Sequence, residues 1–271
     1  MTVTRFLDLP DGRLAYDLTG GPDGPLVVCF PGMGDLRSTW RELAARLAAA
    51  GGRVATVDLR GHGESSLGWP SYRKVDVGED MLALVRALGG PAVLVGNSYS
   101  AGAAVLAAAA EPDLVNGLVL TGPFVRDPKQ SAVQRFSTWF AARPRLGRRI
   151  WTAYWPRFFA TPPADLAERR AALRASLARP GGYDAVRGMM TANPESERAL
   201  PEVRCPALVV MGERDPDFAD PAAEARFVAG ALGGAAEVLM VPDAGHYPQA
   251  EFPAEVAAAT EAFVRSVTCR A

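Results

Sequence analysis

The stretch from Pro91 to Ala110 constrains the fold of this chain more than any other. A short apolar run ends at Gly96, and an alanine-rich run with high helix propensity begins near Ser100. Between the two runs stands Ser98, with small residues two positions before and two positions after it. This layout predicts a strand that turns sharply into a helix with Ser98 at the apex, as in the nucleophile elbow Gly-x-Ser-x-Gly. Ser100 replaces the last glycine of that motif and is small enough for the position.

The same stretch has a simpler interpretation, in which Ser98 only caps the helix that follows a buried strand. In the elbow, by contrast, the Ser98 hydroxyl and the backbone N–H of Tyr99 face one space at a helix N-terminus. The helix dipole favours negative charge at that point. Because a motif this short is only a hypothesis, the choice depends on the rest of the chain.

The composition limits the partners of this chain. Its 271 residues are 49% hydrophobic and carry a formal net charge of −1. This is enough apolar material for a large core, and the near-neutral charge favours neither nucleic acid nor an anionic membrane as a partner. The three scattered cysteines have neither metal-ligand spacing nor the pattern of a disulfide framework. Monomer and homodimer are both compatible with these features.

The first residues lack an apolar signal core, and no run of about 18 apolar residues occurs anywhere in the sequence. We therefore expect a soluble, cytoplasmic protein.

Short apolar runs alternate with amphipathic helical runs along most of the chain. The predicted strands are Val3–Leu9, Arg13–Leu18, Leu26–Phe30, Val54–Val57, Pro91–Gly96, Val115–Thr121, Pro206–Gly212 and Ala236–Val241. The first two flank the turn residues Asp11 and Gly12 and predict an antiparallel hairpin at a sheet edge. The alternation predicts an α/β fold with a mostly parallel eight-stranded sheet flanked by helices.

The pattern changes after the sixth predicted strand. Helical runs such as Ser131–Ala142 and Ala164–Ala178 replace the buried strands up to about residue 201. Helices inserted after the carboxyl end of a strand lie on the side where α/β sheets bind ligands. We therefore expect residues 1–123 and 202–271 to form the core and residues 124–201 to form a helical cap over a pocket.

Aromatic residues are concentrated in the expected cap. Some of them must dock the cap helices onto the sheet, because such helices need an apolar face. Others are expected to line the substrate pocket, and the candidates are Phe124, Trp139, Trp151, Tyr154 and Trp155.

The chain also carries the partners that a nucleophilic serine requires. Attack by a hydroxyl on an acyl carbon needs a base, a carboxylate that orients the base, and donors for the oxyanion. Only two histidines occur, and one of them, His246, follows the last predicted strand, at the sheet edge where Ser98 emerges. Asp215 likewise follows a strand end. Ser98, Asp215 and His246 are therefore the candidate nucleophile, acid and base.

Other residues compete for two of these roles. Asp217 and Asp220 lie close to Asp215 in the sequence, and Asp243 stands three residues before the histidine, from where it would have to fold back. The second histidine, His62, lies in a loop dense with polar residues and glycines, which favours a structural hydrogen-bonding role.

With these motifs in order, the sequence resembles the α/β-hydrolase superfamily from about Val3 to Val267. The motifs that carry the resemblance are Gly96–Ser100, Asp58–Ser65, Gly212–Asp215 and Gly245–Pro253. The resemblance implies an oxyanion hole made by the backbone N–H groups of Met33 and Tyr99. The chain departs from the family at Pro31 and Gly32, where His-Gly is usual, and so lacks one hydrogen bond that packs this loop.

A serine nucleophile excludes the members of this superfamily that attack with Asp, the epoxide hydrolases and haloalkane dehalogenases. We expect a serine hydrolase that cleaves an ester, thioester, lactone or related acyl bond of a small to medium apolar substrate through an acyl-enzyme on Ser98. Fold alone leaves alternatives. These are a hydrolase-like receptor, and a lyase, acyltransferase or cyclase that uses the same three residues. The sequence implies neither a metal ion nor an organic cofactor.

Overall fold

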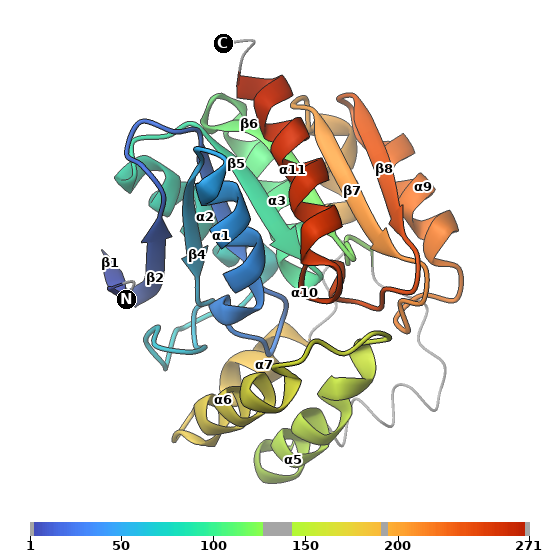
Figure 1. Ribbon diagram of the computed structural model, residues 1–271. Helices are drawn as coiled ribbons and strands as arrows, with labels where there is room; N and C mark the ends of the chain where they lie inside the picture. The colour runs from blue at the N-terminus through green and yellow to red at the C-terminus, as the bar shows by residue number, and fades with distance from the viewer. Residues whose placement is uncertain (1–2, 127–142, 191–194, 269–271) are drawn as a thin grey trace.

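A single sheet of eight strands forms the centre of the computed structural model, which describes residues 3–126, 143–190 and 195–268. The strand order is β1-β2-β4-β3-β5-β6-β7-β8 (Figure 1). Strand β2 pairs antiparallel with both β1 and β4, and all other neighbours pair parallel. The predicted edge hairpin and the mostly parallel eight-stranded sheet are therefore confirmed.

The strands lie close to their predicted positions. They are β1 Arg5–Leu9, β2 Gly12–Thr19, β3 Leu26–Phe30, β4 Arg53–Val57, β5 Ala92–Asn97, β6 Val115–Thr121, β7 Ala207–Gly212 and β8 Ala236–Val241. The helices that accompany them are α1 Arg41–Ala49, α2 Lys74–Ala87, α3 Tyr99–Ala110, α9 Pro221–Ala231, α10 Pro248–Glu251 and α11 Pro253–Thr268.

Helices cover both faces of the sheet, so the central strands are buried on both sides. Every residue of β3, β5 and β7 is buried, which explains why these strands read as continuous apolar runs rather than as alternating ones. Side chains of one strand point alternately to the two faces. In β5, Val93 and Val95 pack toward α1 and α11, whereas Leu94 packs toward α2, α3 and α9.

The strand-to-helix turn at Ser98 depends on a very close approach of backbone. Strand β5 ends at Asn97 and α3 begins at Tyr99, so Ser98 alone makes the turn. Its φ is +53°, which a residue with a side chain rarely adopts. A Cβ on Gly96 would lie only 2.6 Å from the carbonyl oxygen of Ser100. Only a glycine at position 96 therefore lets α3 return this closely over its own strand.

Further helices lie between β6 and β7 in the sequence. They are α5 Pro144–Tyr154, α6 Leu166–Ala178, α7 Asp184–Met189 and α8 Glu195–Ala199. In Figure 1, α5, α6 and α7 lie together below the sheet, on the side toward which β5 and β7 point. The predicted run 164–178 corresponds to α6, whereas Ser131–Ala142 falls outside the described residues. The division into core and cap stays a prediction.

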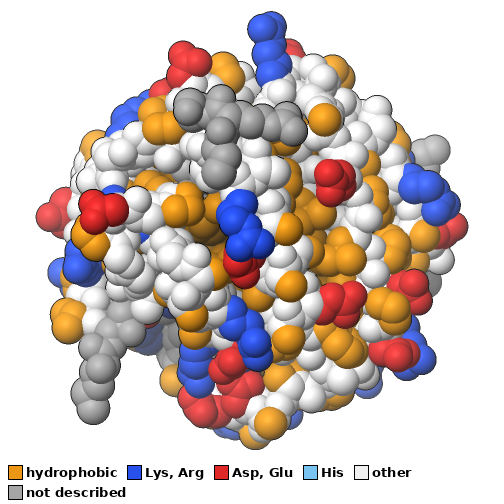
Figure 2. All heavy atoms as spheres, turned by 45° about the horizontal axis from the view of Figure 1, so that its top comes forward, with side chains coloured by type: hydrophobic (Ala, Val, Ile, Leu, Met, Phe, Trp, Pro, Cys, Tyr) orange, Lys and Arg blue, Asp and Glu red, His pale blue; other side chains and the backbone are white. Residues whose placement is uncertain are grey.

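The surface shown in Figure 2 carries mixed charge. Basic and acidic side chains lie beside one another over this face, with hydrophobic side chains between them. Among the described residues, no helix is both long enough and apolar enough to cross a membrane.

The close approach at Gly96 leads to a stability prediction. We expect Gly96→Ala to lower the free energy of unfolding by about 2 kcal/mol, because the new methyl group meets backbone rather than a movable side chain. Gly230→Ala in α9 is the control, since a Cβ there meets nothing within 4 Å and alanine favours a helix. Urea unfolding of both variants measures the difference. Equal stability of the two variants would contradict the account of the turn.

Candidate active site

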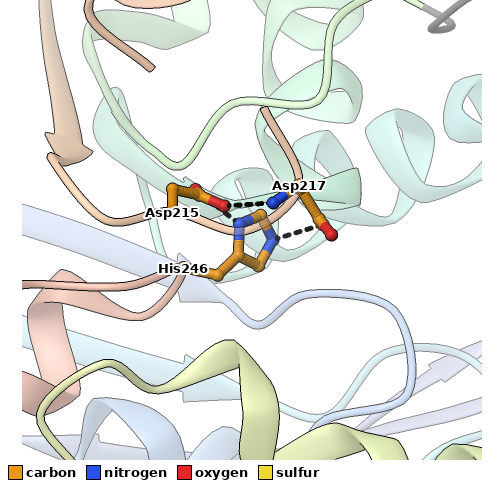
Figure 3. Close-up of side chains that lie close together, drawn as sticks. All are labelled: Asp215, Asp217 and His246. Carbon is orange, nitrogen blue, oxygen red and sulfur yellow. Dashed lines mark hydrogen bonds and ion pairs between the residues drawn. The ribbon is translucent and has the colours of Figure 1, made fainter. Parts of the chain in front are cut away.

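A hydrogen-bonded histidine and aspartate lie at the carboxyl edge of the sheet. Asp215 follows β7 and His246 follows β8, and each residue is only 2% exposed. His246 Nδ1 lies 2.7 Å from Asp215 Oδ2 (Figure 3). The second carboxylate oxygen, Oδ1, accepts a bond of 3.0 Å from the backbone N–H of Asp217. Asp215 is thus the carboxylate that orients the imidazole, as a triad acid would.

The surroundings of His246 favour its charged form. Burial lowers the pKa of the imidazole, but the Asp215 and Asp217 carboxylates outweigh this effect and raise the pKa to about 9. Asp217 Oδ2 lies 3.6 Å from His246 Nε2, the ring nitrogen opposite the bond to Asp215. The imidazole therefore stands between two acidic groups.

The residue before Ser98 ties its turn to the loop that carries His246. The Asn97 side chain donates one hydrogen bond to the carbonyl oxygen of His246, at 3.1 Å, and another to that of Thr121, at 3.0 Å. The backbone N–H of Ser98 donates to the same Thr121 oxygen. The ends of β5 and β6 and the His246 loop are thereby tied together, and Ser98 remains partly exposed at their junction.

The predicted oxyanion loop packs directly against the turn. A Cβ on Gly32 would lie 3.2 Å from the Ser98 Cβ, so the loop approaches the serine closely. The Ser100 hydroxyl donates to the carbonyl oxygen of Pro31 at 2.5 Å. The serine that replaces glycine in the motif therefore holds the elbow helix to this loop. Met33 follows in the loop and Tyr99 is the first residue of α3, where backbone N–H groups lack intrahelical acceptors.

His62 fixes the other end of the same loop. Its Nε2 accepts a bond of 3.0 Å from the backbone N–H of Gly34, and its Nδ1 lies 3.0 Å from the carbonyl oxygen of Arg60. Burial lowers the pKa of this imidazole, which favours the form whose Nε2 can accept the Gly34 bond. His62 thus supplies a hydrogen bond to a loop that lacks the usual family histidine.

Asp35 ends the loop with a buried carboxyl group. Its Oδ1 accepts a bond from the Leu36 N–H, and its Oδ2 has no hydrogen-bond partner among the described residues. Burial raises the pKa of this carboxyl to about 7, against the lowering effects of the Leu36 bond and of Arg169.

Glu251 holds the loop that carries His246. Its Oε1 accepts from the backbone N–H groups of Gly245, at 2.9 Å, and of Tyr247, at 3.3 Å, one on each side of the histidine. Its Oε2 accepts from the Thr161 N–H, on the segment between β6 and β7. A single carboxylate therefore joins the His246 loop to that segment.

The predicted pocket aromatics lie in different surroundings. Phe124 follows β6, and its backbone N–H bonds the Ser98 carbonyl oxygen. Trp151 donates its indole N–H to the Gly34 oxygen at 3.1 Å. Trp155 is 1% exposed and packs on Tyr247, whereas Tyr154 is 40% exposed. Trp139 lies outside the described residues. That these side chains bind substrate stays a prediction.

Two aromatic rings that the sequence did not single out lie beside the imidazole. The Phe158 ring lies 5.5 Å and the Phe218 ring 6.4 Å from the His246 ring, between centroids. Phe218 stands three residues after Asp215 in one loop, a spacing that could have indicated it. No sequence signal points to Phe158, because it stands 88 residues before His246 and meets it only in the folded protein. The backbone N–H of His246 also donates a hydrogen bond to the Phe158 carbonyl oxygen.

Asp220 and Asp243, two of the other candidates for the acid, bond to groups other than His246. Asp220 Oδ1 caps α9 by accepting from the Ala223 N–H, and Asp243 pairs with Arg214 at 2.6 Å on the surface.

Asp215, Asp217 and His246 offer three potential metal ligands within 4.8 Å of one another. Because Asp215 Oδ2 and His246 Nδ1 bond each other, this group is explained as a hydrogen-bonded pair with a neighbouring acid, and we assign no metal to it.

The matching family model settles the relationship of this chain to known proteins. The model of the alpha/beta hydrolase family matches residues 27–259. The chain belongs to the alpha/beta hydrolase family. It is an enzyme of this type, and the sequence-based expectation of the family is confirmed.

Individual relatives agree with this assignment. A 2-(acetamidomethylene)succinate hydrolase of Mesorhizobium japonicum is 28% identical over 90% of this chain and 89% of its own length. The structure of a malate-bound thermophilic esterase from Thermogutta terrifontis superimposes with a TM-score of 0.82, at 26% identity, and covers 98% of this chain and 99% of that one. A haloalkane dehalogenase from Bradyrhizobium elkani, with 22% identity and a TM-score of 0.80 over both whole chains, shares the fold.

The charge of His246 predicts the pH dependence of catalysis. A general base acts in its neutral form, so we expect kcat/KM for an ester to rise as the pH passes through about 9 and to level off above it. Initial rates from about pH 6 to about pH 10 measure this profile. A profile that levels off below neutral pH would contradict the assignment of His246 as a base between two acids.

The carboxyl group of Asp35 predicts a pH-dependent stability. Its pKa is higher in the folded protein than in the unfolded chain, so its contribution to stability falls as the pH rises from about 4 to about 7. We expect Asp35→Asn to raise the Tm relative to wild type by about 2 °C or more at pH 8, and by less at pH 5. Thermal unfolding of wild type and Asp35→Asn at both pH values gives the two differences in Tm. If the Tm difference were the same at both pH values, this account would be wrong.

Proposed function

We propose that this protein is a serine hydrolase that cleaves an ester, thioester, lactone or related acyl bond through an acyl-enzyme on Ser98. The observation that carries the proposal is the buried pair of Asp215 and His246, tied through Asn97 to the turn that exposes Ser98. An imidazole oriented by a buried carboxylate beside a serine at positive φ supports nucleophilic catalysis.

In the proposed reaction, His246 Nε2 takes the proton of the Ser98 hydroxyl as Oγ attacks the acyl carbon. The Asp215 carboxylate keeps the proton on Nδ1 and stabilises the imidazolium that forms. The backbone N–H groups of Met33 and Tyr99 receive the oxyanion. His246 then gives its proton to the leaving group, and the same residues activate the water that hydrolyses the acyl-enzyme.

The proposed substrate is apolar in its acyl part and small to medium in size. Support comes from the aromatic rings around the base, Phe158 and Phe218, and from Phe124 beside the serine. Two of the relatives are named as hydrolytic enzymes, an esterase and a 2-(acetamidomethylene)succinate hydrolase. We propose residues 124–201 as the cap over this pocket.

A panel of p-nitrophenyl esters tests the proposal. We expect wild type to hydrolyse short to medium acyl esters faster than esters with a charged acyl group. Ser98→Ala should lower kcat by about 10⁴-fold or more, since it removes the nucleophile. Ser266→Ala, on the exposed surface of α11, is the control and should retain wild-type rates.

Turnover in Ser98→Ala at the wild-type rate would overturn the proposed nucleophile. A preference for charged short acyl groups would overturn the apolar pocket. A wild-type enzyme that hydrolyses none of these esters but binds their non-hydrolysable analogues would favour a receptor.

A further inference from the structure

Asp217 contacts both members of the histidine–aspartate pair. Its backbone N–H donates to Asp215 Oδ1 at 3.0 Å, and its carboxylate Oδ2 lies 3.6 Å from His246 Nε2. Figure 3 shows the two carboxylates on opposite sides of the imidazole ring. Because the sequence is Asp215-Pro216-Asp217, one short turn places an acid at each ring nitrogen.

The two carboxylates interact with the imidazole in different ways. The contact of 2.7 Å between Asp215 and Nδ1 is a hydrogen bond, whereas 3.6 Å between Asp217 and Nε2 exceeds hydrogen-bond distance. Asp217 therefore acts on the ring through its charge, which is felt strongly in a buried site. Its side chain is 27% exposed, whereas that of His246 is 3% exposed.

Nε2 is the atom that takes the serine proton in the proposed mechanism, so this inference rests on the proposed function. We propose that Asp217 is a positioning residue of the catalytic base: its backbone N–H fixes the Asp215 carboxylate, and its own carboxylate stabilises the charged imidazolium of His246 from the Nε2 side.

The other acidic groups that act on the His246 ring already bond other atoms, so they do not take the place of the Asp217 carboxylate on the Nε2 side. The other acids that act on the ring are Asp215, already bonded to Nδ1, and Glu251, which accepts three backbone N–H bonds. Three rings, those of Phe158, Phe218 and Tyr247, lie around the imidazole, and their faces carry no charge that could replace that of Asp217. Burial and the nearby Asp215 carboxylate raise the pKa of Asp217 above its usual range, while the charge of His246 acts in the opposite direction and favours the carboxylate.

Stabilising the imidazolium slows the proposed reaction at neutral pH and accelerates it at alkaline pH. At neutral pH it keeps the resting base protonated, and a protonated base cannot accept the Ser98 proton. At alkaline pH the base is neutral, and the same charge favours the imidazolium that forms in the transition state. Removal of the Asp217 charge should therefore shift the pH–rate profile to lower pH and reduce the rate at its alkaline plateau.

The test combines a direct titration of the imidazole with a kinetic readout. We expect Asp217→Asn to lower the pH midpoint of the His246 ring, followed by NMR, by about 1 to 3 pH units. The signal that disappears in His246→Gln identifies the ring. The pH dependence of Ser98 labelling by a fluorophosphonate, followed by intact mass, should shift by the same amount, and its plateau rate should fall.

Two variants serve as controls. Asp217→Glu keeps the carboxylate and should retain most of the wild-type midpoint. Asp220→Asn removes a negative charge from the same loop and keeps a side chain that can cap α9, so its midpoint should equal that of wild type.

An unchanged His246 midpoint in folded Asp217→Asn would overturn the inference. If Asp217→Asn and Asp217→Ser both fail to fold, Asp217 is a structural residue and the inference is equally wrong. If the midpoint shifts as expected but no variant, nor wild type, is labelled at Ser98, the action of Asp217 on the ring stands and the proposed function fails.

Discussion

The structure of the site depends on one turn of backbone, that between β5 and α3. A single residue, Ser98, reverses the chain at a φ of +53°. This conformation is costly for a residue with a side chain, and it persists because its surroundings fix it. β5 is buried on both faces, α3 packs against its own strand over Gly96, and Ser100 and Asn97 bond the adjoining loops. These contacts hold Ser98 in its strained conformation at the carboxyl edge of the sheet.

The second constraint is electrostatic. An imidazole that is almost fully buried would ordinarily be neutral. Here two carboxylates from one turn make the charged form favourable and raise its pKa to about 9. In the mechanism that we propose, the same arrangement favours proton transfer to His246 in the transition state and opposes the neutral resting base at neutral pH.

Much of this arrangement could be predicted from sequence order. Buried parallel strands read as apolar runs, and their carboxyl ends meet at one edge, so Ser98, Asp215 and His246 were expected to lie near one another. Asp215 bonds His246 Nδ1, whereas Asp220 caps a helix and Asp243 pairs with Arg214. The catalytic role of Asp215 stays a prediction.

Contacts between distant segments could not be predicted in this way. The bond from Gly34 to His62, the bond from Thr161 to Glu251, and the ring of Phe158 beside His246 all join segments whose meeting is set by three-dimensional packing. Periodicity also cannot separate a docking aromatic from a pocket aromatic. Trp155 and Tyr154 are neighbours in the sequence, yet one is buried and the other exposed.

The measurement that tests the central claim most directly is the location of a trapped acyl group. Wild-type enzyme would be mixed with excess p-nitrophenyl acetate, quenched with acid during turnover, digested and analysed by tandem mass spectrometry. The account predicts the mass of one acetyl group on Ser98 and none in the Ser98→Ala variant. Turnover with no acetylated Ser98, or with the acetyl group on another residue, would contradict it.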